Sequence, residues 1–526
     1  MMAYDCIIVG GGSAGCVLAA RLSENPKTRV LLIEAGGSDR NFLFRWPAGF
    51  AKMTKGIASW GWSTVPQKHL QNRVFRFTQA KVIGGGSSIN AQLYNRGNRL
   101  DFDEWCQKGC DGWSYRDVLP YFKRSEDFER GADEFHGVGG PVGVSDPRST
   151  LPICEAFFAA AGQLGIPRNL DMNGASQDGI GYYQLTQKNA QRSSSATAYL
   201  NPFRSRANLT VKCDVETKQI VLEGSRAVAV ECLSGEIFHA EQEIILTAGA
   251  IGSPKLLLQS GIGPVDHLTE VGMKTSHHLP GVGSNLQDHL DLFVISECTG
   301  DHTYDKYSKP LWAGVAGLQY VFNRTGPVAS ALFSQGGFWY ADENALSADM
   351  QFHFGLGSGI EAGVAKLKNA GATLNSAYMR PRSRGTVRLA SNDPTAAPHI
   401  DPNYWSDPYD REMSVKGLRM ARDIMNQSAL KPFILREHLP GLEKMTDSEL
   451  FDYACHHAKT DHHPVGTCRM GRDDMAVVTP DLKVRGLERL RVCDASIMPN
   501  IVTGNTNAAT LMIAEKAADM IKLEGQ

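Results

Sequence analysis

The sequence carries no block of basic residues and no long apolar run. Its 526 residues contain 54 Lys and Arg against 56 Asp and Glu, which gives a formal net charge of −2 at pH 7. This balance offers little to a nucleic acid or to an anionic membrane surface. No stretch approaches the roughly 20 apolar residues that span a bilayer, and the N-terminus lacks the features of a secretory signal. We therefore expect a cytoplasmic protein with no nucleic-acid partner and no membrane span.

Paired metal-binding cysteines are also missing. The eleven cysteines are an odd number and include no C-x-x-C pair. Cys106 and Cys110 stand four apart, but no second pair completes a zinc site. We expect no metal, and we expect the thiols to be structural ones in a reducing compartment.

What the chain has in quantity is length and glycine. At 526 residues it exceeds what one hydrophobic core usually serves, so two or more domains are expected. The 53 glycines cluster in short runs, which is typical of backbone that approaches a bound ligand. The chain opens with an apolar strand over residues 5–9, a helix over 13–24 and a second apolar strand over 29–34. This order predicts a βαβ unit.

The rest of the chain predicts an inserted second domain. Residues 40–110 have weak periodicity and indicate long loops. Helices are expected over 115–128, 152–164, 410–427 and 507–522, and strands over 208–213, 218–222, 226–232, 236–247, 348–354, 386–389 and 490–493. The fold class is therefore α/β, with a discontinuous first domain and an inserted α+β domain. The first comprises 1–150, 195–290 and 441–526, and the second comprises 151–194 and 291–440.

A phosphate-binding loop follows the first predicted strand. Gly10 to Gly15 fits G-x-G-x-x-G, in which glycines allow a tight turn and the close approach of a pyrophosphate to a helix N-terminus. Glu34 ends the next strand nineteen residues after Gly15, at the position that binds a ribose hydroxyl. The motif predicts a bound adenine dinucleotide and leaves FAD and NAD open.

The longer motifs resemble the glucose–methanol–choline (GMC) oxidoreductase family over the whole chain. Residues 80–103, which contain Ala-Lys-Val-Ile-Gly-Gly-Gly-Ser-Ser-Ile-Asn, are similar to its first signature, and 249–263 are similar to its second. Further blocks in family order are 280–289, 383–389, 463–471 and 494–499. The blocks 49–54, 66–69, 84–90 and 471–475 are similar to those of the bacterial L-sorbose dehydrogenases within the family. Choline and aliphatic-alcohol dehydrogenases share several of them.

The resemblance implies that the cofactor is FAD and that the discontinuous first domain is a Rossmann-like FAD-binding domain. It also implies that the inserted domain is an α+β substrate domain that carries an antiparallel sheet. Three consecutive glycines at 84–86 remove side chains, so that a loop can lie against a flat ring. The implied cofactor-binding residues are Gly10, Gly12, Ser13, Ala14, Gly15, Glu34, Ala35, Trp60, Val82, Gly85, Asn90, Ala91, Gln92, Leu93, Val215, Asp494, Ala495, Thr506 and Asn507. Some relatives attach the flavin through a histidine just before the signature asparagine. Ile89 stands there in this chain, so we expect non-covalent FAD.

The resemblance also implies a catalytic pair, His463 and Asn505. Oxidation of an alcohol carbon requires that the hydroxyl proton leave to a base, and a neutral histidine suits this near pH 7. His463 opens the His-Pro-Val-Gly-Thr block, where the family keeps its base, and Asn505 would hydrogen-bond the substrate oxygen. We expect His462 to point elsewhere and to pack, as we do His456 and His457.

These assignments predict an FAD-dependent alcohol dehydrogenase with a small-molecule substrate. The first candidate is a sugar or polyol, with L-sorbose oxidised to L-sorbosone. The alternatives are an aliphatic, aromatic or choline-like primary alcohol, and a lyase of the same fold that keeps FAD as a structural part. The electron acceptor would be a quinone-like compound or oxygen. His353, on a predicted strand of the inserted domain, could face the substrate or be a satisfied core histidine.

Overall fold

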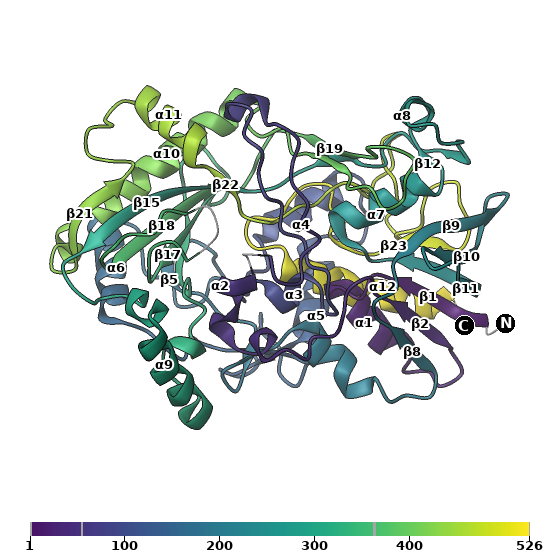
Figure 1. The fold of residues 1–526 in the computed structure, drawn as a ribbon, viewed down its shortest axis with the longest axis horizontal. Coiled ribbons are helices and arrows are strands. Elements are labelled where there is room, and N and C mark those ends of the chain that lie inside the picture. Colours follow the sequence, from purple (N-terminus) through teal and green to yellow (C-terminus); the bar gives the residue numbers. More distant parts are fainter. Residues whose placement is uncertain (1–2, 54–55, 361–363, 525–526) are drawn as a thin grey trace.

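The computed structural model describes residues 3–53, 56–360 and 364–524. Two large sheets lie at opposite ends of the molecule, and both chain termini lie beside the first of them (Figure 1). Thr54, the last residue of the block at 49–54, falls outside the described residues. Among the described helices, none has the length and the apolar content needed to cross a membrane.

The first sheet is built around the predicted βαβ unit. β1 (Ala3–Val9), α1 (Ser13–Leu22) and β2 (Val30–Ile33) form where expected, and β1 and β2 pair in parallel. The remaining strands are β8 (Leu209–Lys212) beside β2, β11 (Ile237–Leu246) beside β1, then β10 (Arg226–Cys232) and β9 (Thr217–Glu223), with β23 (Leu490–Val492) also on β11. β1 after Ala3 and all of β2 are buried, because both faces of a parallel sheet are covered.

Helices from distant parts of the chain meet on this sheet. The C-terminal helix α12 (Asn507–Glu524) packs against α1 and against α5 (Tyr115–Ser125), so the end of the chain returns to its beginning (Figure 1). α7 (Gly249–Gln259) packs against β9. The expected Rossmann-like sheet, completed by a C-terminal strand and helix, is confirmed.

The second sheet is antiparallel throughout. Its strands run in the order β21 (Ile434–Leu439), β15 (Leu290–Cys298), β18 (Gly371–Tyr378), β17 (Met350–Gly355), β16 (Gln335–Trp339) and β5 (Gly179–Tyr182), with β22 (Lys459–Thr460) also on β15. The helices α6 (Pro152–Gln163), α10 (Pro408–Met425) and α11 (Asp447–His457) share one hydrophobic core with it. β22 and α11 thus lie with the second sheet, although they belong to the segment 441–526 that we assigned to the first domain.

Alternation along β17 gives the second sheet two different faces. Met350, Phe352 and Phe354 belong to the core beneath the helices. The residues between them point the other way, as strand geometry requires, and His353 there reaches the cavity described below. The face of the sheet that carries Met350, Phe352 and Phe354 therefore packs in the core, and the opposite face supplies side chains to the cavity.

The expectation of long loops over 40–110 is wrong in one stretch. α4 (Arg99–Gln107) is a nine-residue helix that begins with a capping box, in which Asn98 caps the helix and the Asp101 carboxylate accepts a hydrogen bond from the backbone of Asn98. Phe102 and Trp105 form its buried side. The capping box was visible in the sequence, but the apolar face is too narrow to register as periodicity.

The smaller elements connect these layers. They are α2 (Phe50–Met53), α3 (Gly86–Ile89), α8 (Val265–Glu270), α9 (Pro310–Asn323), β3 (Glu126–Phe128), β4 (Val142–Val144), β6 (Gln187–Lys188), β7 (Gln191–Arg192), β12 (Ile262–Gly263), β13 (His277–His278), β14 (Ser284–Leu286), β19 (Gly385–Arg388) and β20 (His399–Asp401). The other elements are a π-helical segment, η4 (Ala196–Leu200), and short 3-10 segments, among them η2 (Pro47–Gly49) and η7 (Pro327–Ala329).

Candidate active site

A cavity of about 320 Å³ lies between the two sheets and is lined by residues from both of them. The predicted site residues that line it are Gly10, Gly12, Ser13, Ala14, Glu34, Ala35, Trp60, Gly85, Asn90, Ala91, Gln92, Leu93, Val215, His463, Asp494, Ala495, Asn505, Thr506 and Asn507. Two predicted residues are not among the described residues that line it, Gly15 and Val82.

Both of these residues have packing roles in the structure. A Cβ on Gly15 would lie 1.9 Å from the carbonyl oxygen of Gly10, so glycine permits α1 to approach the loop that precedes it. Val82 is buried in a small core with Phe44, Met53 and Ile89. Gly15 came from the glycine motif and Val82 from the family resemblance, but neither signal shows which side of the backbone faces the ligand, because the folded loop decides it.

The glycine-rich loop presents backbone and a helix end to the cavity. Gly10 has φ +108°, and a Cβ there would lie 2.6 Å from the carbonyl oxygen of Thr247. Gly12 precedes the first turn of α1, and a Cβ on it would meet nothing nearer than 3.7 Å. The open space beside Gly12 and the N-terminus of α1 together suit a pyrophosphate.

Glu34 is held by the same loop. Its two carboxylate oxygens accept hydrogen bonds from the backbone N–H groups of Gly11 and Gly36, each at 2.7 Å. Burial raises the pKa of Glu34 to about 7, although these two N–H groups favour the charged form. The carboxyl group therefore stabilises the turn and also faces the cavity, where it can accept a ribose hydroxyl.

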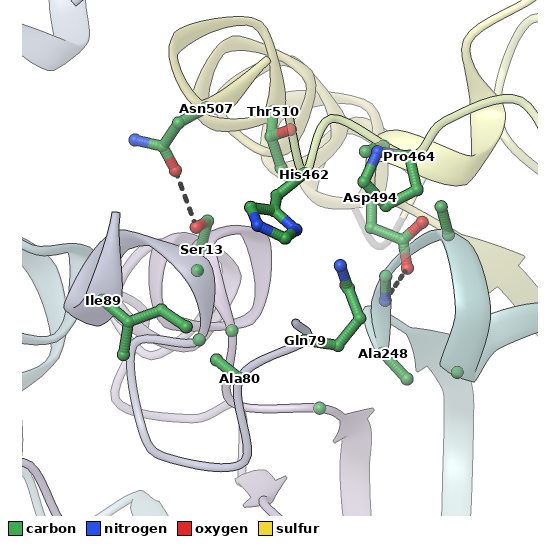
Figure 2. Close-up of a pocket in the computed structure, with 18 of the residues that line it drawn as sticks. Ser13, Gln79, Ala80, Ile89, Ala248, His462, Pro464, Asp494, Asn507 and Thr510 are labelled. Atoms are coloured by element: carbon green, nitrogen blue, oxygen red, sulfur yellow. Dashed lines mark hydrogen bonds between the residues drawn. The ribbon is translucent and has the colours of Figure 1, made fainter. Parts of the chain in front are cut away.

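The N-terminus of α12 faces the cavity from the opposite side. The Ser13 hydroxyl donates to Asn507 Oδ1 at 2.8 Å and so joins the first turns of α1 and α12 (Figure 2). The Asp494 carboxylate accepts from the backbone N–H of Gly249 and from the Ser253 hydroxyl, which links the second signature to the final segment. Two helix N-termini thus place partial positive charge on one cavity.

Asn90 in the signature loop is oriented by a residue that the sequence reasoning missed. Asn90 Oδ1 accepts a hydrogen bond from Arg192 Nη1 at 2.6 Å, and Arg192 also donates to the carbonyl oxygen of Ser87. Arg192 is buried, and this burial lowers its pKa to about 9. Nothing in the sequence marks Arg192, because it lies about a hundred residues from the loop it supports.

His463 and Asn505, the predicted catalytic pair, lie next to each other in the cavity. Asn505 Nδ2 lies 3.1 Å from His463 Nε2, while Asn505 Oδ1 accepts from the side-chain amides of Asn95 and Gln351. Because Oδ1 is committed to these two donors, the amide NH₂ is the group that faces the histidine. Nε2 of His463 must then be the acceptor, and the ring carries its proton on Nδ1.

A second histidine supports the same tautomer. His289 Nε2 lies 3.1 Å from the carbonyl oxygen of Met379, to which it can only donate, so His289 Nδ1 is an acceptor. His463 Nδ1 lies 3.0 Å from His289 Nδ1 and 3.2 Å from Asp461 Oδ2. Both of these atoms are acceptors, so His463 Nδ1 carries the proton and donates it. This series of hydrogen bonds, from Met379 through His289 and His463 to Asn505, leaves the lone pair of His463 Nε2 beside the Asn505 amide, which would bind a substrate oxygen.

Charge at this site is kept low. Burial lowers the pKa of His463 far below its ordinary value, and the neighbouring His289 and His353 act in the same direction. Burial also lowers the pKa of His289 to about 4. The imidazole of His463 is therefore neutral at physiological pH, as a base must be. Asp288 accepts the backbone N–H of His463 at 2.7 Å and fixes its position.

The expectation for His462 is wrong. His462 lines the cavity and points into it between Thr510 and Gln79 (Figure 2). Its backbone has φ +61°, a conformation that few residues other than glycine adopt, and this bend turns consecutive side chains toward one site. By contrast, His456 and His457 lie on α11 and are not among the described residues that line the cavity.

Several other lining residues were not identified from the sequence. They include Phe50, Trp62, Thr78, Gln79, Ala80, Thr217, Lys255, Gln259, Phe333, Asn375 and Asp461. Lys255 and Gln259 lie within the second signature, four residues apart on α7, and this helical spacing could have indicated them. The open question about His353 is answered, since it lines the cavity and its buried Nε2 has no hydrogen-bond partner among the described residues.

Known proteins resemble this chain along its full length. The family model described as GMC oxidoreductase matches residues 4–291 with its N-terminal part and 381–514 with its C-terminal part. The oxygen-dependent choline dehydrogenases of Escherichia coli K12 and Shigella flexneri serotype 5b are each 42% identical to it over 534 residues, covering 99% of this chain and 96% of theirs.

Solved structures agree with the sequence comparison. A pyridoxine 4-oxidase from Mesorbium loti matches with a TM-score of 0.90 at 32% identity, covering 99% of both chains. A formate oxidase from Aspergillus oryzae RIB40 matches with a TM-score of 0.93 at 27% identity, covering 99% of this chain and 98% of that one. With the dinucleotide loop, the paired helix ends and the neutral histidine in one cavity, this chain belongs to the GMC oxidoreductase family, the FAD-dependent oxidoreductases that act on CH–OH groups.

Proposed function

We propose that this enzyme oxidises the primary hydroxyl of a small amino alcohol of the choline type, with His463 as the base and Asn505 as the group that holds the substrate oxygen. The observation that carries the proposal is the hydrogen-bond chain from Met379 through His289 to His463 and Asn505. It presents an unprotonated ring nitrogen and an amide donor 3.1 Å apart, and a substrate hydroxyl that enters between them could accept from the amide and give its proton to the ring.

The cavity residues fit FAD, which when bound supplies the acceptor for the hydride that leaves the alcohol carbon. Gly10, Gly12 and the N-terminus of α1 would hold its pyrophosphate, and Glu34 its ribose. Ile89 lines the cavity where a covalent link would need a histidine, so we propose that the FAD is bound non-covalently. Acid denaturation should then release free FAD into the supernatant, and yellow colour retained by the precipitate would contradict this.

The substrate side of the cavity supports a cationic alcohol. Phe50 and Phe333 both line it, with their ring centroids 6.3 Å apart, and aromatic faces attract quaternary ammonium groups. The Asp461 carboxylate lines the same cavity. The full-length relatives named as choline dehydrogenases favour this substrate class over the L-sorbose of our first expectation.

A polyol remains the second candidate because of two polar atoms on the second sheet. His353 Nε2 and Asn375 Oδ1 are buried, line the cavity, and have no partner among the described residues. Additional hydroxyl groups of a sugar could satisfy them. An FAD-containing lyase is the least favoured alternative, since a base and an oxygen-binding amide are both in place. Because the E. coli relative is an oxygen-dependent choline dehydrogenase, oxygen is favoured as the electron acceptor over a quinone-like compound.

Anaerobic reduction of the bound flavin tests the substrate class without involving any acceptor. Choline, its neutral analogue 3,3-dimethylbutan-1-ol, L-sorbose and benzyl alcohol would be mixed separately with the holoenzyme. We expect choline to bleach the flavin fastest. Equal rates with the neutral analogue would show that the cation is not recognised, and faster bleaching by L-sorbose would establish the polyol instead. A flavin that no alcohol bleaches would contradict alcohol oxidation itself.

A further inference from the structure

α9 (Pro310–Asn323) is an apolar helix that most of the molecule leaves uncovered. It contains no charged residue, and it projects from the body beside the second sheet (Figure 1). Its exposed large side chains are Leu311, Trp312, Val315, Leu318, Val321 and Phe322, with Leu311 76% and Phe322 79% exposed. Within the helix, only Ala316 and Tyr320 are buried. A contiguous apolar surface of this kind marks an interaction site.

Tyr320 holds α9 to the body, and the helix also contacts η7 and the 3-10 segment Asp305–Ser308 on either side of it. The Tyr320 hydroxyl donates to the carbonyl oxygen of Ala190 at 2.8 Å, and its ring packs against Trp46 at 5.4 Å. Because this contact uses a single side of the helix, the remaining sides stay available to a partner. The helix is thus positioned firmly while most of its apolar surface is presented outward.

The charge around α9 identifies the kind of partner. Lys306 and Lys309 precede the helix and Arg324 follows it, and no acidic residue occurs between Asp305 and Asp342. Lys306 Nζ lies 5.6 Å from the ring centroid of Trp312, so charge and aromatic surface occur together at one end. Apolar side chains flanked by basic and aromatic residues are typical of helices that lie in the interface of an anionic bilayer.

We propose that α9 docks this enzyme peripherally onto membranes that contain anionic phospholipids. The near-neutral charge of the whole chain predicted no such attraction, but the local balance of this segment is three positive charges and no negative one. A second copy of the chain is the less favoured occupant. An isologous dimer through this face would bring two sets of Lys306, Lys309 and Arg324 together.

The docked face lies near the cavity. η7 follows α9 directly and contacts η2. Phe333 comes four residues after the end of η7, and Phe50 comes directly after η2; both rings line the cavity. The bilayer would therefore contact an element that is continuous in sequence with the aromatic wall of the site. The docking itself requires no assumption about the substrate.

Vesicle flotation of the holoenzyme tests the proposal. Vesicles of phosphatidylcholine alone would be compared with vesicles that also contain phosphatidylglycerol, at low and at high salt. We expect the protein to float with the anionic vesicles at low salt and binding to fall by about tenfold or more at high salt or without phosphatidylglycerol. Binding that ignores lipid charge, or no binding to either vesicle, would overturn the proposal.

Variants can show whether vesicle binding depends on α9 or on nonspecific hydrophobic adsorption. The double variant Leu318→Glu/Phe322→Glu should lose vesicle binding while keeping its flavin content and its rate of anaerobic flavin reduction. The matched control is Leu346→Glu, which removes an exposed leucine outside α9 and should bind like the wild type. Lys306→Gln/Lys309→Gln should weaken binding to anionic vesicles only. If α9 instead mediates dimerisation, the wild type will sediment as a dimer that the double glutamate variant dissociates, without vesicle binding.

Discussion

The two sheets contribute to one cavity in different ways. The first contributes mainly backbone, through Gly10, Gly12 and the helix ends of α1 and α12. The second contributes side chains from alternate strand positions, such as His353 and Asn375. Backbone sites need glycine and a short motif, while side-chain sites need a strand to keep its register. We infer that substitutions on the second sheet can change the substrate without disturbing the cofactor.

His463→Ala should have the largest effect, because it removes the proposed base while the dinucleotide loop of the first sheet stays intact. It should therefore separate catalysis from cofactor binding. We expect normal FAD content and a loss of roughly 10²–10⁴-fold in the rate of anaerobic flavin reduction, which is typical for a general base. Stopped-flow absorbance measures this step apart from reoxidation. Asn505→Ala should lose less, because an amide orients the oxygen and accepts no proton.

The neighbouring histidine is the control for that variant. His462 also lines the cavity, so His462→Ala tests whether position in the cavity is enough. We expect flavin reduction close to the wild-type rate. The assignment of the base would be wrong by one residue if His462→Ala lost the activity and His463→Ala retained it.

Glu34→Gln should have the opposite effect: it should weaken FAD binding by the first sheet and leave catalysis unchanged. The amide cannot accept from both Gly11 and Gly36, because its NH₂ group would face one of their N–H groups. We expect reduced FAD occupancy but an unchanged rate per bound flavin. Occupancy would be read from the flavin-to-protein absorbance ratio, with the exposed Glu236→Gln as control. Full occupancy at micromolar FAD would exclude Glu34 as a ligand.

The pH profile should sharpen the assignment of the base. Burial lowers the pKa of His463, so the neutral form persists below the ordinary histidine pKa of about 6.5. We expect kcat/KM to stay on its plateau as the pH falls through 6.5 and to decline only at lower pH, where the ring becomes protonated. An inflection at the ordinary value would indicate that the base is solvated or is a different group.

The smallest expected effect concerns a clamp that the buried His136 forms with Glu126 and Asp171. Burial opposes the charge of His136, but hydrogen bonds to Asp171 and Glu126 raise its pKa to about 9. The pKa of His136 is higher in the folded protein than in the unfolded chain. The protonated ring therefore contributes its full share of folding stability below pH 6.5, and this contribution is lost as the pH rises through 9.

Thermal melts between pH 6 and pH 10 test this clamp. The wild type should lose more stability over that window than His136→Gln does, because the amide cannot titrate. Parallel pH dependences for the two proteins would show that His136 carries no proton linked to folding.

Local patterns predicted much of this protein correctly. The βαβ unit, the phosphate-binding loop and the positions of His463 and Asn505 follow from apolar periodicity, glycine spacing and family blocks. Each of these signals lies within a few turns of chain, where strand and helix geometry determine which neighbours share a face. α4 shows the limit, since its capping box was local but its buried side was too narrow to stand out.

Only the tertiary structure decided which side chains meet. The sequence determined that His463 and Asn505 belong to one site, but His289, Asp288 and Arg192 orient that site from more than a hundred residues away. The direction of the His462 side chain depends on one backbone dihedral angle. The exposure of α9 depends on which other elements pack against it in the folded protein. These contacts join segments that are remote in the chain, so no periodicity or spacing encodes them, and only the folded chain brings the residues together.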